Sequence, residues 1–256
     1  PILITSSKKN TWWPPSWSYS DRKEEYGAPI TKYSIASNAS TNALNNPIDN
    51  FINELNTSLV RNNLSSKYFI KPVYNDFSID FVSTIKSVNF APLYILLNLV
   101  NSESHNYTAE VVFRHSLNNW SHDFPNVKYT KWLKDQNFDS DDFIFADASG
   151  LSRENRVTTY GLSQFLRRMQ LSRYSDYYFS SFSILGVRGS LKNVKAPINL
   201  KGRILAKSGR LSNVRSISGI ILGKDKIFSI IVNNKENSTK NIINILSIVD
   251  NTNYCT

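Results

Sequence analysis

The chain has 256 residues, 41% of them hydrophobic, and its formal net charge of +10 is spread along the sequence, which argues against a nucleic-acid-binding protein. This length can bury a sizeable core in one or two domains, and no apolar run reaches the roughly eighteen residues of a membrane-spanning helix. The one cysteine, Cys255, excludes an internal disulfide, and the three histidines lack ligand spacing, so we expect neither a metal nor a cofactor.

Three elements are predicted in the N-terminal third of the chain. Residues 2–5 read as a short strand, and the Trp- and Pro-rich segment that follows opposes helix formation. An Asn/Ser-rich run at residues 34–46 precedes a predicted helix, because apolar residues recur at three- and four-residue steps from Ile48 to Leu59. A second strand is expected at residues 69–73.

Two helices with buried faces are predicted on either side of a Ser-His-Asn sequence at residues 104–106. Pro92 suits a first helical turn, and apolar residues recur at helical spacing in residues 93–100 and again in residues 107–114. A hinge between two packed helices is a rigid place from which a serine and an asparagine can face a cleft. His105 is expected at the surface.

The C-terminal third predicts an antiparallel sheet covered by a helix. Residues 203–211, 214–222 and 226–233 are rich in Ile and Val, and their links are only two and three residues long. Such short links make consecutive strands antiparallel neighbours. Residues 239–250 carry apolar residues at helical spacing and are expected to lie on the sheet.

The triplet Lys207-Ser208-Gly209 falls on the first of these strands. The lysine can supply a fixed positive charge, the hydroxyl can donate to a substrate carboxylate, and the glycine lets a peptide lie against the strand. Taken alone, the triplet is more often a solvated turn in a basic protein.

Three blocks in fixed order favour the chemical interpretation. They are Asp-Ala-Ser-Gly-Leu-Ser-Arg at residues 147–153, Gly-Val-Arg-Gly-Ser-Leu at residues 186–191 and Ala-Lys-Ser-Gly-Arg-Leu at residues 206–211. This arrangement resembles the class C low-molecular-mass penicillin-binding proteins, the D-alanyl-D-alanine carboxypeptidase/endopeptidase family. The family reads Asp-Gly-Ser-Gly-Leu-Ser-Arg, Gly-x-x-Gly-Ser/Thr-Leu and Ala-Lys-Thr-Gly-x-Leu, so Ala148 and Ser208 are small departures.

The resemblance implies an α+β fold, with an antiparallel sheet flanked by helices as in penicillin-binding and β-lactamase-like transpeptidases, and with trimmed inserted segments. It implies a serine-type D-Ala-D-Ala carboxypeptidase, possibly also an endopeptidase in the same acyl chemistry, in which Ser104, Asn106 and Lys207 are catalytic. Other Ser-x-Asn copies occur at Ser40, Ser87 and Ser116, and only the context of residues 104–106 resembles the family.

The resemblance also implies a set of substrate-binding residues. Asp21 would pair with the amine of a stem peptide's dibasic residue, although a surface aspartate beside Arg22 and Lys23 is an equally good interpretation. The Arg153 guanidinium could bind a carboxylate in two places at once. The full set is Ser208, Gly209, Arg210, Arg153, Ser190, Asp21 and Tyr26, with the Arg210 backbone N–H as half of an oxyanion hole.

The nucleophile is the missing element. Ser-x-x-Lys occurs at Ser6–Lys9 and at Ser83–Lys86, but catalysis needs both groups on one helical turn. Ser6 follows a predicted strand, and the Ser83 copy lies just before the helix that leads to the Ser-His-Asn sequence. We reject both and expect a C-terminal fragment whose nucleophile and signal peptide precede Pro1.

The expected organisation is an upstream or inserted segment at residues 1–86 and the C-terminal part of the peptidase domain at residues 87–256. The expected ligands are peptidoglycan stem peptides ending in D-Ala-D-Ala, and β-lactams, in a periplasmic or otherwise extracytoplasmic location. A degenerate, non-catalytic wall-binding module is the alternative function.

Overall fold

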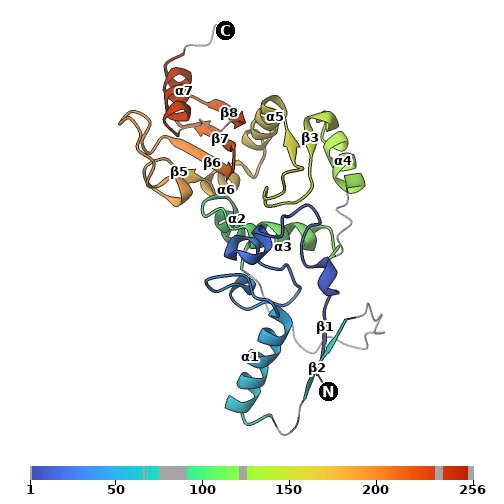
Figure 1. The fold of residues 1–256 in the computed structure, drawn as a ribbon. Coiled ribbons are helices and arrows are strands. Elements are labelled where there is room, and N and C mark those ends of the chain that lie inside the picture. Colours follow the sequence, from blue (N-terminus) through green and yellow to red (C-terminus); the bar gives the residue numbers. More distant parts are fainter. Residues whose placement is uncertain are drawn as a thin grey trace. The chain divides into compact units, whose positions relative to one another are not determined.

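The computed structural model describes residues 2–65, 67, 69–74, 91–120, 126–233 and 239–252 (Figure 1). The chain divides into two compact units. Unit 1 comprises Pro1–Phe90, Asn106–Phe124 and Ala146–Arg153, and unit 2 comprises Ala91–His105, Pro125–Phe145 and Glu154–Thr256. No helix in the described residues combines the length and apolar character needed to cross a bilayer.

Unit 2 is built on a four-stranded antiparallel sheet. Its strands are β5 (Ser183–Ile184), β6 (Ile204–Leu211), β7 (Val214–Ile221) and β8 (Lys226–Asn233), in the order β5-β6-β7-β8. Asn213 turns the chain between β6 and β7 with φ 65°, in the left-handed region that asparagine tolerates. The three long strands confirm the predicted meander, whereas β5 was not predicted.

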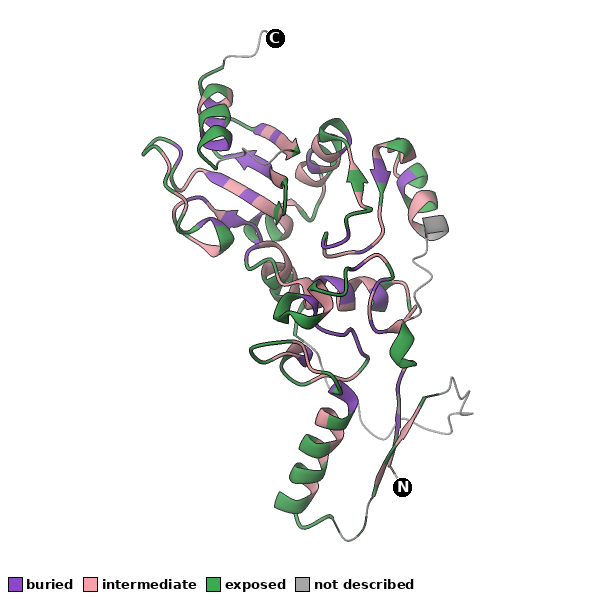
Figure 2. Ribbon diagram, in the orientation of Figure 1, coloured by how far each residue is buried: buried purple, intermediate pink, exposed green. Residues whose placement is uncertain are grey.

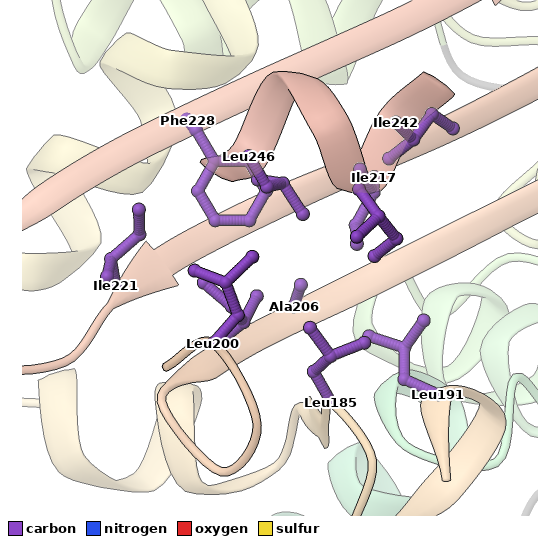
Figure 3. Packing of buried hydrophobic residues seen from close by; sticks show 11 residues of the cluster. Leu185, Leu191, Leu200, Ala206, Ile217, Ile221, Phe228, Ile242 and Leu246 are labelled. Atoms are coloured by element: carbon purple, nitrogen blue, oxygen red, sulfur yellow. The ribbon is translucent and has the colours of Figure 1, made fainter. Parts of the chain in front are cut away.

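The predicted final helix is confirmed as α7 (Thr239–Asn251), which covers one face of this sheet. Ile242, Ile243 and Leu246 of α7 are buried in one apolar cluster with residues of the strands. Figure 3 shows Leu246 beside Phe228 of β8, between the helix and the sheet. The helical spacing in the sequence thus marks the face that packs on the strands.

The other face of the sheet is covered by α5 (Thr159–Gln170) and α6 (Ser175–Ser180). Leu166, Phe179 and Phe182 form a second buried cluster with Ile220 of β7. Thr158 caps α5, because its hydroxyl accepts a hydrogen bond of 2.9 Å from Gly161 N. The remaining elements of unit 2 are α2 (Leu93–Asn101), α4 (Asn126–Asp135), β3 (Phe143–Ile144), β4 (Arg156–Val157), and the 3-10 helices η5 (Ser140–Asp142) and η6 (Gly189–Leu191).

Helix α2 forms as predicted, but the expectation that it buries one face is wrong. None of its residues is fully buried, and Leu93 is 59% exposed. Its described helical contact is with α6, where the ring of Tyr94 lies 6.2 Å from that of Tyr177, so only part of its surface is covered. His105, expected at the surface, is half-buried.

The described residues of unit 1 form two α-helices, several 3-10 helices and a short parallel pair of strands. Strand β1 (Ile2–Thr5) pairs in parallel with β2 (Ile70–Val73). The two α-helices are α1 (Pro47–Arg61) and α3 (Asn106–Ser116). Figure 2 shows α1 mostly exposed along its length, with burial near its start. Short 3-10 helices lie at η1 (Lys9–Thr11), η2 (Asp21–Lys23), η3 (Glu25–Gly27) and η4 (Ala36–Asn38).

Candidate active site

Ser104 and Lys207 of unit 2 are in direct contact. Lys207 Nζ donates a hydrogen bond of 2.8 Å to Ser104 Oγ. Ser104 lies in the turn after α2 with φ 58°, a left-handed backbone that is uncommon for serine and is often found at functional sites. The same turn returns His105 N to the carbonyl of Leu99 at 3.0 Å, which closes the end of α2 and fixes the position of Ser104.

The surroundings of Lys207 favour the neutral form of its amine over the charged form. It is half-buried on β6 and donates a second bond of 2.5 Å to the carbonyl oxygen of Ser208. Burial lowers the pKa of Lys207 to about 8. Both of its described hydrogen-bond partners are neutral, so Lys207 can hold an anion and can exchange a proton near neutral pH.

A second contact joins the Gly-Ser-Leu block to the Lys-Ser-Gly strand. Ser190 Oγ of η6 and Ser208 Oγ of β6 are 2.8 Å apart. Ser190 Oγ is also 3.0 Å from Ser183 Oγ of β5. The two hydroxyls that the sequence assigns to substrate therefore belong to one hydrogen-bonded group.

One edge of β6 carries backbone groups that no described strand pairs. Leu222 N donates to Arg203 O at 2.8 Å, and hydrogen-bonded pairs alternate along an antiparallel ladder, so the odd-numbered residues of β6 exchange bonds with β7. The N–H groups of Ser208 and Arg210 therefore point to the opposite edge. Strand β5 pairs with this edge only before Lys207. An extended peptide could add to β6 here, with the Arg210 N–H beside it.

Gly209 lies close to a serine side chain on β7. A Cβ at this position would overlap Ser216 Oγ on the adjacent strand. A side chain here would make Ser216 turn its hydroxyl away, so the packing of the sheet favours glycine in addition to the substrate-facing role expected from the sequence.

Unit 1 brings together three other predicted site residues. Asp21 Oδ1 accepts a hydrogen bond of 3.1 Å from the phenol of Tyr26, and Asp21 Oδ2 accepts one of 2.6 Å from Ser18. Asn106, at the start of α3, donates from Nδ2 to the carbonyl oxygen of Tyr26 at 3.0 Å. Burial and then the bond to Asp21 raise the pKa of Tyr26, and the positive charge of Arg153 opposes this shift.

The loop that ends at Arg153 is held by two buried carboxylates. Asp147 accepts hydrogen bonds from Gly150 N (2.8 Å), Ser152 N (2.5 Å) and the indole of Trp17 (2.8 Å). Glu110 of α3 accepts 2.9 Å bonds from two further N–H groups of this loop, at residues 148 and 149. Burial and then the charge of Asp147 raise the pKa of Glu110 to about 7.

The predicted site residues thus form two groups. In unit 2, hydrogen bonds link Lys207 to Ser104 and to Ser208, and Ser208 to Ser190, and Gly209 and Arg210 follow on the same strand. In unit 1, hydrogen bonds link Tyr26 to Asp21 and to Asn106, and Arg153 acts on Tyr26 through its charge. The convergence of Asn106 with Ser104 and Lys207 on one pocket stays a prediction.

The structure agrees with the rejection of Ser6 as a nucleophile. Ser6 follows β1, its N–H donates to Val73 O at 2.9 Å, and its side chain is buried. Lys9 begins a separate 3-10 helix, so the two residues do not share a helical turn. Ser83 and Lys86 lie outside the described residues.

Sequence reasoning missed Ser183, Glu110 and the Trp17–Asp147 pair. Ser183 lies on a strand of only two residues, which leaves no periodic pattern. Glu110 and Arg114 are four residues apart on α3, and this spacing was a usable sign of a charged pair on one helical face. Trp17 and Asp147 are 130 residues apart, and such a contact leaves no local trace in the sequence.

Solved structures with the same fold include a penicillin-binding protein and an endopeptidase. Penicillin binding protein 4 (dacB) from Haemophilus influenzae matches with a TM-score of 0.60 and 20% identity, covering 77% of this chain and 45% of that one. The Bd3459 predatory endopeptidase from Bdellovibrio bacteriovorus, solved with immunity protein Bd3460, matches with a TM-score of 0.56 and 15% identity, covering 90% of this chain and 63% of that one. The chain therefore spans 45% to 63% of the length of these two proteins.

The match at the level of sequence families is more specific. Among curated proteins no match is found. Residues 80–252, however, match the profile of the D-Ala-D-Ala carboxypeptidase 3 (S13) family. This segment includes the Ser104 turn, the loop of Asp147 and strand β6. Because the match covers more than half of the sequence, the chain belongs to the D-Ala-D-Ala carboxypeptidase 3 (S13) family.

Proposed function

We propose that this chain supplies part of the active site of a serine-type D-Ala-D-Ala carboxypeptidase that acts on peptidoglycan stem peptides outside the cytoplasm. The observation that carries the proposal is the 2.8 Å hydrogen bond between Lys207 and Ser104. Lys207 lies on β6, and Ser208 follows it on the same strand. Membership of the S13 family supports the substrate class.

In the proposed reaction, a serine gives its hydroxyl proton to a neighbouring lysine, attacks the carbonyl carbon between the two D-alanines and forms an acyl-enzyme. The C–N bond breaks, and the leaving amine takes the hydroxyl proton of Ser104. Lys207 donates into Ser104 Oγ, so it can return a proton to this oxygen. Water then hydrolyses the ester and frees the serine. Cleavage of a cross-link uses the same steps with a different leaving amine.

Substrate binding is assigned to the free edge of β6 and to the hydroxyls beside it. The terminal carboxylate would lie at Ser208, close to the ammonium of Lys207, and the peptide would run along the edge that carries the Arg210 N–H. Asn106 would hold the substrate amide, and Asp21 with Tyr26 and Arg153 would recognise the stem peptide.

A binding experiment on this chain tests the proposal. The ligand is N-acetyl-D-Ala-D-Ala, and the measurement is its dissociation constant by NMR titration for the native protein, Lys207→Gln and Lys195→Gln. Lys195 is exposed and serves as the matched control. We expect binding to be lost in K207Q and retained in K195Q; equal affinities in all three proteins would contradict the proposal.

Labelling with a fluorescent penicillin separates a catalytic chain from a non-catalytic wall-binding module. Acylation of a serine within the chain, followed by turnover, is the result for an enzyme. Peptide binding without acylation is the result for a module, or for a site whose nucleophile this chain does not supply. Labelling of Ser6 would contradict its rejection as the nucleophile.

A further inference from the structure

Three serine hydroxyls of unit 2 form an unbroken chain that starts at a buried carbonyl group. Ser183 Oγ donates to the carbonyl oxygen of Ser102 at 2.9 Å. Ser183 Oγ lies 3.0 Å from Ser190 Oγ, which lies 2.8 Å from Ser208 Oγ. The chain thus connects the end of α2, two residues before Ser104, with the Lys-Ser-Gly strand.

The direction of every bond in this chain follows from its buried end. A carbonyl oxygen only accepts, so the single proton of Ser183 goes to Ser102. Ser183 must then accept the proton of Ser190, and Ser190 must accept the proton of Ser208. With all three bonds formed, Ser208 has no proton left and offers only lone pairs to a ligand.

The inner end of the chain is fixed by packing. Ser102 and Ser183 are both 0% exposed, and Ser190 N also donates to Ser102 O, at 2.8 Å. Gly189 has φ 68°, and a Cβ on it would overlap atoms of Ser102 and Ser183. Only glycine therefore lets η6 bring Ser190 this close to both groups.

A bound carboxylate reverses part of this order. A carboxylate only accepts, so Ser208 must turn its proton to the ligand. Ser190 then has one proton for two neighbouring oxygens, since it lies 3.0 Å from Ser183 Oγ and 2.8 Å from Ser208 Oγ. Whichever oxygen it donates to, the number of protons is unchanged and the other contact loses its hydrogen bond. Carboxylate binding therefore costs one buried hydrogen bond.

We infer that Ser183 is a positioning residue that acts through Ser190 to set whether Ser208 accepts or donates a hydrogen bond. In the free protein Ser183 keeps Ser208 an acceptor, suited to an N–H group. A bound carboxylate makes Ser208 a donor, at the cost of one hydrogen bond among the three serines. The inference rests on the proposed function only in placing a carboxylate at Ser208; the order of protons in the free protein is independent of it.

Neutron diffraction from deuterium-exchanged crystals of the ligand-free protein tests the direction of these hydrogen bonds. We expect deuterium on Ser208 Oγ directed to Ser190, on Ser190 Oγ directed to Ser183, and on Ser183 Oγ directed to Ser102 O. A deuterium on Ser190 directed to Ser208 would overturn the inference, whether or not any peptide binds.

Peptide affinities give the second measurement. N-acetyl-D-Ala-D-Ala is compared with its C-terminal amide, whose N–H can donate to Ser208 without reversal. Ser183→Ala should favour the carboxylate over the amide by about tenfold relative to the native protein, since one hydrogen bond no longer has to be lost. Ser247→Ala, which removes a hydroxyl bonded to Ile243 O on α7, is the matched control and should leave the ratio unchanged.

The outcomes separate the two proposals. An unchanged ratio in S183A contradicts the positioning role of Ser183 while leaving carboxylate binding in place. Failure of the native protein to bind either peptide contradicts the proposed function, and the neutron result then decides the proton order alone.

Discussion

Lys207 and Ser104 are 103 residues apart in sequence, and their side chains share a hydrogen bond of 2.8 Å in unit 2. The lysine projects from a strand that is paired along its whole length with β7, and the serine from a left-handed turn that closes a helix. The strand and the turn hold the ammonium and the hydroxyl at hydrogen-bond distance, which proton transfer between them requires.

The lowered pKa of Lys207 predicts a specific dependence of stability on pH. The folded pKa of about 8 lies below the ordinary lysine value of 10.5, so between these pH values the unfolded chain binds more protons. The titration of Lys207 should therefore increase the free energy of unfolding as pH rises from 8 to 10.5. Urea unfolding of the native protein and of Lys207→Met across this range measures it. The gain should be absent in K207M and present in Lys195→Gln; an equal gain in K207M would contradict the assignment.

Glu110 predicts the opposite slope at lower pH. Its pKa is raised to about 7 by burial and then by the charge of Asp147, so the folded chain binds more protons than the unfolded one between pH 4.5 and 7. Its contribution to stability is complete below pH 4.5 and is lost as pH rises through 7, a change of about 3 kcal/mol at most.

Urea unfolding at pH 5 and pH 7.5 tests this slope. Glu110→Gln should remove the loss of stability, because an amide does not titrate in this range. Glu54→Gln, on the exposed side of α1, is the control and should behave as the native protein. The same pH slope in E110Q and the native protein would show that Glu110 titrates normally.

Replacing Asp147 should destabilise unit 1. In Asp147→Asn the new amide nitrogen cannot accept from Trp17 Nε1 or Ser152 N, which both donate to Oδ2. Leaving buried donors unpaired should cost about 2 to 4 kcal/mol. Chemical unfolding followed by tryptophan fluorescence measures the loss. Ser149→Ala removes two long contacts of 3.4 Å, one with Asp147 and one from Leu151 N, and should change stability by less than about 0.5 kcal/mol. Similar losses in both variants would refute the anchoring role of Asp147.

Gly219 of β7 should tolerate no side chain. A Cβ there would overlap the carbonyl oxygen of Leu205 and lie 2.7 Å from Ala206 Cα, both backbone atoms of β6. Gly219→Ala should therefore cost about 3 kcal/mol or more through displacement of the strand that carries Lys207. Gly223→Ala is the control, since nothing lies within 4 Å and only its φ of 79° is unfavourable; its cost should be about 1 kcal/mol. Thermal unfolding compares the two, and equal costs would mean that β6 and β7 can separate.

Local patterns in the sequence predicted the long elements of the sheet. The strands around Lys207 are rich in β-branched residues and joined by short links, so their pairing needs no distant information. The spacing of Ile242, Ile243 and Leu246 likewise fixes which side of α7 is buried. Burial of α2 was predicted wrongly by the same reasoning, because periodicity states which face is apolar and not how much other structure covers it.

The contacts within the candidate site could be predicted only where the family blocks carry them. The pairing of Lys207 with Ser104 was predicted through the family resemblance, because no local sequence pattern indicates that the two side chains are close in space. Ser183 could not be found, because a two-residue strand has no period and its partner Ser102 lies 81 residues away. Proton order in the hydroxyl chain depends on one buried carbonyl, which only the folded structure places.

A crystal structure of this chain with N-acetyl-D-Ala-D-Ala would show whether Ser104 and the Lys-Ser-Gly strand bind the substrate. We expect the peptide to be extended along the free edge of β6, with its carboxylate within hydrogen-bond distance of Ser208 Oγ and its amide nitrogen near Ser104 Oγ. A peptide bound elsewhere, or no binding at millimolar concentration while Lys207 and Ser104 stay in contact, would contradict it.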